Sequence, residues 1–170
     1  MSDWMKGDAR DLQRLPAMAC GLYRTGQGLD GPSPVGEMRL VYLHDHRPEE
    51  WPTVHLPTEL TLGRWDFGEG IDVLHAPFLL ALEQLPPEGW YVLRQAVVAS
   101  AQDGTELPAK SLVALGYNRS GEAILTPAQF GAREVRFAEL GLRFEGADVL
   151  DQLDPVNFEV PEDTARRVLH

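Results

Sequence analysis

The sequence has a single cysteine, Cys20, among its 170 residues. One cysteine excludes an internal disulfide and the zinc sites that need two or more thiolates. The neighbouring residues in "LPAMACGLY" supply no base for Cys20, and a Gly-x-Ser-x-Gly nucleophile elbow is also missing. We therefore predict a buried, unreactive thiol, and the sequence favours a protein that is not an enzyme.

Long apolar runs are missing as well. No window approaches the roughly 20 apolar residues that a membrane-spanning helix needs. The first residues, "MSDWMKGDARDLQRLP", contain no apolar stretch like that of a secretory signal. The sequence therefore predicts a cytoplasmic protein with no membrane partner.

Basic residues are scarce, with 15 Lys and Arg against 26 Asp and Glu and a formal net charge of −11. This charge repels the phosphates of nucleic acids and anionic lipids, so we expect no nucleic-acid partner. It attracts a basic protein partner instead. The spacing of "GQGLDG" imitates a dinucleotide-binding loop, but Pro32 and Pro34 follow where a helix would have to begin. We expect no cofactor.

The composition fits one globular domain, because 44% of the residues are hydrophobic and the length is typical of a single domain. The chain contains no internal repeat, low-complexity tract or linker. We predict a single domain over residues 1–170, with flexible ends at 1–7 and 162–170.

Short apolar runs separated by proline and glycine predict many short strands. In residues 140–144, for example, Leu140, Leu142 and Phe144 alternate with polar or small residues, as in a half-buried strand. The run "WYVLRQAVVA" is apolar on both sides and predicts a strand covered on both faces. The expected strands are 17–24, 37–43, 53–56, 59–65, 90–99, 111–117, 122–127, 134–138, 140–144 and 156–160.

Two segments predict helices. In "APFLLALEQLPP", apolar residues repeat at helical spacing between Pro77 in the first turn and Pro86 at the end. In "GADVLDQLDP", Val149, Leu150 and Leu153 form the apolar side. The predicted fold class is mainly β (α+β), an antiparallel barrel or a strongly bent sheet with one or two short helices.

The clearest local pattern is "SLVALGYNRSGEAILTPAQF", residues 111–130, which predicts two strands joined by a four-residue turn. Counting back from the turn pairs Tyr117 with Glu122 and Leu115 with Ile124. Gly121 supplies the positive φ angle that closes the turn. Hairpin geometry therefore explains this loop without a ligand.

The best candidate metal ligands lie in "VYLHDHRPEEWPTVHLP". His44 and His46 point to one side of an extended chain, and His55 follows on the next strand as a third ligand. Together with Glu50, the His-x-His pair resembles the first metal-binding motif of cupins, which implies a metal-dependent enzyme in a double-stranded β-barrel. A polar hairpin end that carries histidines without a metal is the alternative.

Aromatic residues among acidic ones suggest a protein-binding surface. Trp51 lies between prolines in the loop 45–52, and Trp65 and Phe67 lie in "GRWDFGEG", which we interpret as a turn region. Arg119 stands at the tip of the hairpin turn and is free to bind. The alternative for each tryptophan is a place in the core.

These features predict a non-enzymatic, acidic, soluble interaction protein of the accessory, adaptor or immunity type, which binds a basic protein partner. The alternative is a cupin-like metal-dependent enzyme that uses the His-x-His pair. Strands that are apolar on two sides also suggest a homodimer.

Overall fold

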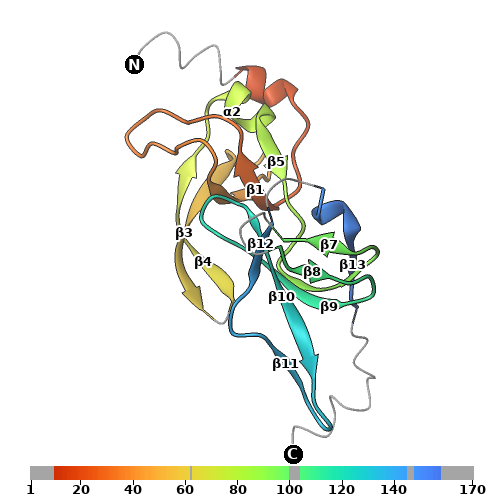
Figure 1. Cartoon of the computed structure of the whole chain (residues 1–170). Coiled ribbons are helices and arrows are strands. Elements are labelled where there is room, and N and C mark those ends of the chain that lie inside the picture. Colours follow the sequence, from red (N-terminus) through yellow and green to blue (C-terminus); the bar gives the residue numbers. More distant parts are fainter. Residues whose placement is uncertain (1–9, 62, 100–103, 145–147, 158–170) are drawn as a thin grey trace, which may run out of the picture.

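The computed structural model describes residues 10–61, 63–99, 104–144 and 148–157. Strands dominate and form antiparallel sheets, and the helical segments of residues 10–14 and 76–80 lie at one end of the molecule (Figure 1). This confirms the predicted mainly β fold with short helices. The expected flexible ends and the end of the expected strand 156–160 lie outside the described residues.

The first sheet has the strand order β4-β3-β2-β1-β5, and every pairing in it is antiparallel. Its outer strands β4 and β5 do not pair with each other, so the sheet is open. Its strands are β1 (Gly21–Thr25), β2 (Leu40–His44), β3 (Thr53–Thr61), β4 (Arg64–Asp72) and β5 (Leu82–Gln84).

The second sheet has the order β11-β10-β9-β6-β13, with β12 also pairing with β10, and it too is open. The β10–β11 hairpin extends away from the rest of the molecule (Figure 1). Within the described residues, therefore, the bent-sheet alternative holds and the barrel does not. The strands are β6 (Gly89–Leu93), β9 (Leu112–Tyr117), β10 (Ala123–Phe130), β11 (Val135–Phe137), β12 (Leu142–Phe144) and β13 (Leu153–Pro155), and β7 (Val97–Val98) and β8 (Glu106–Leu107) form a separate ribbon.

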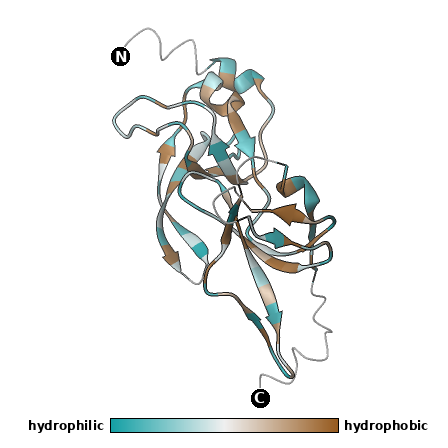
Figure 2. Cartoon of the chain, in the orientation of Figure 1, coloured by the Kyte–Doolittle hydropathy of each residue, from teal (hydrophilic) through white to brown (hydrophobic). Residues whose placement is uncertain are grey.

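Apolar side chains cover both faces of the first sheet. On one face, Leu22 and Leu40 belong to a core shared with Leu93 and Leu125 of the second sheet. On the other face, residues of β1–β3 pack against the helical segments in a second core. Figure 2 shows hydrophobic residues along the strands of both sheets and on these helical segments. The order of layers is thus helices, first sheet, second sheet.

The strand covered on both faces is not the expected one. The segment 90–99 breaks after β6, and Trp90 is 43% exposed. Strands β1 and β2 are instead covered on both sides, since successive residues such as Leu40 and Val41 enter different cores. Similarly, the expected strand 53–56 and the first part of the expected strand 59–65 form one strand, β3, whereas residues 64 and 65 already belong to β4. Trp65 and Phe67, expected in a turn region, lie on the strand β4.

Both predicted helices are shorter than expected. The first ends at Leu80 as α2 (Ala76–Leu80), and the following residues form β5, which pairs with β1. The second is a single 3-10 turn, η1 (Leu150–Gln152), after which β13 pairs with β6. In each case the segment pairs with the free edge of a distant strand, β1 or β6, and gains backbone hydrogen bonds there. Helical spacing along the chain gives no information on such pairings. Residues 10–14 form a helix that the sequence pattern did not reveal.

The β9–β10 hairpin forms where predicted, but its register differs by one residue. Tyr117 pairs with Ala123 and Leu115 with Leu125, so the loop has five residues, 118–122. A slip of one residue exchanges the two faces of a strand. As a result Leu125, and not Ile124, joins Tyr117 in the core.

Gly121 has φ +71°, as predicted. We expect Gly121→Ala to lower the free energy of unfolding by about 1–2 kcal/mol, the usual penalty for a side chain in this left-handed region. The new Cβ would also approach the flexible side chain of Arg24 to 3.2 Å. Urea unfolding of both proteins measures the difference, and equal stability would contradict the assigned conformation.

Candidate functional site

The segment that follows β2 is anchored by a buried ion pair between Asp45 and Arg47. The Nε and Nη2 atoms of Arg47 donate to the two oxygens of Asp45 at 2.8 and 2.6 Å. Arg47 also donates to the backbone carbonyls of Leu12 and Pro16, and the Met18 amide donates to Asp45. The side chains of Asp45 and Arg47 are only 0% and 6% exposed. The ion pair therefore fastens the loop 45–52 to the chain between residues 12 and 18.

The electrostatics of this pair favour its charged form. Burial alone would raise the pKa of Asp45, but the hydrogen bonds from Arg47 and Met18 outweigh burial and lower it. The hydrogen bond to Asp45 raises the pKa of Arg47 in turn, against the effect of burial. The pair thus stays ionised at neutral pH. Sequence reasoning missed both residues, although the alternation that turns His44 and His46 outward implies that Asp45 turns inward.

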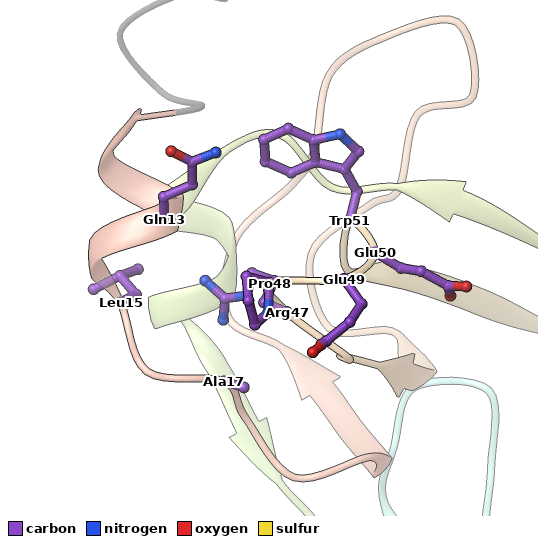
Figure 3. Close-up of a pocket in the computed structure, with 8 residues that line it drawn as sticks. All are labelled: Gln13, Leu15, Ala17, Arg47, Pro48, Glu49, Glu50 and Trp51. Atoms are coloured by element: carbon purple, nitrogen blue, oxygen red, sulfur yellow. The ribbon is translucent and has the colours of Figure 1, made fainter.

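A cleft of about 440 Å³ lies above this ion pair, between the loop 47–51 and the segment 13–17. In Figure 3, the indole of Trp51 and the side chain of Gln13 stand on its two sides, with Arg47 between them. Glu49 and Glu50 also belong to its lining, and both are exposed. Neither carboxylate has an ion pair with any residue in the described part of the chain. The cleft therefore combines an accessible aromatic ring, 40% exposed at Trp51, with unpaired negative charge.

The other predicted binding residues make internal contacts. Trp65 and Phe67 are half-buried on β4 and pack against the core between the sheets. The Trp65 indole donates to the Tyr117 carbonyl at 2.7 Å, and the Arg119 guanidinium lies 5.1 Å from the centre of its ring. Arg119 also donates to the carbonyls of β3 at Thr58 and its preceding proline. These contacts join the β3–β4 hairpin to the β9–β10 hairpin.

His44 and His46 lie together at the end of β2, with ring centres 5.9 Å apart, and the structure adds Cys20 to them. The β1–β2 register pairs Gly21 with Leu43, so one further residue along each strand places Cys20 opposite His44. The expectation of a buried thiol is wrong, because Cys20 is exposed and its sulfur lies 3.9 Å from Nε2 of His46. Cys20, His44 and His46 are the group among the described residues whose potential metal-ligand atoms lie within 4.8 Å of one another.

The cupin-like set of ligands is not assembled, since neither His55 nor Glu50 belongs to that group. His55 contacts the ring of His44 edge-on at 5.0 Å. Its Nδ1 lies 2.8 Å from the Gly68 carbonyl and its Nε2 3.2 Å from the Thr53 hydroxyl. Because a carbonyl only accepts hydrogen bonds, Nδ1 carries the proton and Nε2 accepts from Thr53. Both nitrogens of His55 are therefore already used.

Two further clefts were not predicted. One of about 720 Å³ lies between the loop 28–33 and β4, and it is lined by apolar residues together with Asp30 and Asp72. Another of about 380 Å³ contains Glu88. One oxygen of Glu88 accepts from the Trp65 amide at 3.4 Å, whereas Oε1 is buried without a hydrogen-bond partner among the described residues. Burial raises the pKa of Glu88. Nothing in the sequence around Glu88 indicated a buried carboxyl, since it follows two prolines in a connecting segment.

Comparison with known proteins finds no matching family model, no matching curated protein and no matching solved structure. None of the helices in the described ranges combines the length and the apolar character needed to span a bilayer.

Proposed function

We propose that this chain is a non-enzymatic interaction protein that binds a basic segment of a protein partner at the cleft beside Trp51. The observation that carries the proposal is the combination of an exposed indole with two carboxylates that have no ion pair in the described part of the chain. A lysine or arginine side chain would stack on the indole face through a cation–π contact. The carboxylates of Glu49 and Glu50 would then balance its charge.

The charge of the whole chain supports a basic partner. At −11, it would steer a positively charged segment toward the surface and raise the rate of association, most strongly at low salt. The same charge disfavours nucleic acid and anionic membranes. A cytoplasmic location remains part of the proposal.

The rigid base of the cleft is a further argument for binding. Arg47, which lines the cleft, uses four of its five guanidinium N–H groups in hydrogen bonds to Asp45 and to two backbone carbonyls. A partner therefore does not have to displace these hydrogen bonds or order the Arg47 side chain. Binding to a surface that is already ordered loses less conformational entropy, so a modest contact area suffices for measurable affinity.

The predicted homodimer stays a prediction. The exposed apolar residues Phe130 and Val135, which pair with each other on the β10–β11 hairpin, support it. The alternative function, a cupin-like enzyme, has less support, because the described sheets are open and the expected ligands do not converge on one point.

The proposal is tested by capture of a partner from a lysate of the source organism on the immobilised chain, followed by affinity measurement with the captured protein. We expect retention at low salt, release at high salt, and binding through a segment rich in lysine or arginine. Trp51→Ala should weaken the affinity at least about tenfold, or 1.4 kcal/mol. A Glu49→Gln/Glu50→Gln double variant should weaken it and reduce its dependence on salt.

Trp90→Ala is the matched control, because Trp90 is similarly exposed, at 43% against 40% for Trp51, but lies on the second sheet. It should bind like the original chain. Equal loss in both variants, undiminished binding by Trp51→Ala, or no retained protein at low salt would each contradict the proposal.

A further inference from the structure

We propose that Cys20, His44 and His46 form a binding site for one Zn²⁺ ion at the shared end of β1 and β2. This inference does not depend on the proposed protein-binding function. It differs from the cupin-like prediction in its ligands, because a thiolate replaces the carboxylate of Glu50 and His55 takes no part as a ligand.

The positions of the donor atoms fit a small metal ion. Zinc bonds of about 2.0–2.3 Å in tetrahedral geometry place neighbouring donor atoms roughly 3.3–3.7 Å apart. The sulfur of Cys20 and Nε2 of His46 are 3.9 Å apart, and all three donor atoms lie within 4.8 Å of one another. All three residues are exposed, so small side-chain rotations can close the remaining distance without disturbing the core.

Strand pairing makes this arrangement a product of the fold. Cys20 and His44 come opposite each other through the β1–β2 register, and His46 follows two residues later on the same side of the extended chain. The buried ion pair of Asp45 and Arg47 fixes the backbone between and beyond the two histidines. Donor atoms from two strands and an anchored loop need little rearrangement to bind a metal.

Neighbouring groups orient the proposed ligand atoms. The backbone N–H of Asp45 donates to the sulfur of Cys20 at 3.3 Å, a contact of the kind that orients metal-bound thiolates. His55 holds the ring of His44 edge-on while its own nitrogens bind Gly68 and Thr53.

The set of donors also selects the kind of metal. One sulfur and two imidazole nitrogens suit borderline-soft ions such as Zn²⁺, whereas Mg²⁺ and Ca²⁺ prefer oxygen ligands. Three protein ligands leave the fourth tetrahedral position open to water or to an added ligand.

The test uses the full chain, reduced and freed of metal, titrated with ZnCl₂ in competition with a chelator of known affinity. We expect one Zn²⁺ per chain. Cys20→Ser, His44→Ala and His46→Ala should each weaken binding at least about tenfold, and His75→Ala, which removes a histidine near α2, should leave it unchanged. Because the three proposed ligands are exposed, circular dichroism should show that their variants are folded.

Two measurements identify the ligand atoms directly. Co²⁺ should give a thiolate-to-metal charge-transfer band that disappears in Cys20→Ser, and one equivalent of Zn²⁺ should slow the alkylation of Cys20 by iodoacetamide. Failure to bind one Zn²⁺, full affinity in all three variants, or a Co²⁺ spectrum unchanged in Cys20→Ser would overturn the assignment.

Discussion

Arg47→Ala is expected to lower the free energy of unfolding by about 3–5 kcal/mol, the loss that follows when one partner of a buried ion pair is removed. The carboxylate of Asp45, with none of its side chain exposed, would remain in the interior without a counter-ion. The carbonyls of Leu12 and Pro16 would also lose their donor. Urea unfolding followed by far-UV circular dichroism measures the change.

The matched control is Arg94→Ala. Arg94 pairs with Asp154 at 2.6 Å, but the two side chains are 56% and 52% exposed, so the loss should be about 1 kcal/mol or less. If the two variants were equally stable, the buried pair would not be the anchor of the loop 45–52.

The pH dependence provides a second readout of the same pair. Because the folded chain lowers the pKa of Asp45, its stabilisation is complete above the ordinary aspartate value of about 3.9 and is lost as the pH falls through the lowered pKa. In Arg47→Ala, the buried carboxylate is destabilising until it is protonated. The difference in stability between the two proteins should therefore shrink as the pH falls from 7 to 3. Above about pH 3.9 it shrinks because the buried carboxyl of the variant becomes protonated, and below that value because Asp45 of the original chain does. A constant difference between pH 7 and pH 3 would contradict the assigned role of the charge.

Trp65→Ala is expected to lower the free energy of unfolding by about 3 kcal/mol, near the lower end for removal of a buried aromatic ring because Trp65 is only partly buried. The change removes the packing against the core between the sheets, the hydrogen bond to the Tyr117 carbonyl and the contact with Arg119. Because these contacts link β4 to the β9–β10 hairpin, the variant loses interactions between the two sheets. Urea unfolding again measures it.

Trp90→Ala serves as the control for Trp65 as well. The ring of Trp90 is 43% exposed and contacts Phe137, so the loss should be smaller, about 1–2 kcal/mol. The comparison also decides between the two roles considered for Trp65. If Trp65 were a binding residue, Trp65→Ala would weaken partner capture and leave the free energy of unfolding nearly unchanged. That outcome would support the prediction from the sequence that Trp65 and Arg119 bind a partner.

The loop 45–52 carries both proposed sites. His46 belongs to the zinc site, Trp51 to the cleft, and the ion pair of Asp45 and Arg47 lies between them. The short sequence "HDHRPEEW" therefore contains outward-facing ligands, a buried anchor and a binding surface in succession. Zinc titration and partner capture separate the two proposals, because each has its own variants and its own readout.

The fold class was predictable because its signals are local. Alternating side chains and closely spaced turn residues indicated short antiparallel strands, and the positive φ of Gly121 followed from the turn between two apolar runs. The errors occurred where distant partners decided the outcome. Residues 82–84 have helical spacing but complete the free edge of β1, and the β9–β10 register shifted by one residue so that Leu125 reached the core.

In the candidate sites, too, local signals were predictable and contacts between distant residues were not. Local sequence was enough to predict the acidic charge, the shared direction of His44 and His46, and the exposed Trp51 in its proline-flanked loop, since each depends on composition or on neighbours along the chain. Folding was needed to bring Cys20 to the histidines and to form the buried pair of Asp45 and Arg47 beneath the cleft. The folded chain also places Trp65 and Arg119 in contacts that join the two sheets. Strand register and burial depend on pairings between residues far apart in the sequence, and local side-chain periodicity does not specify these pairings.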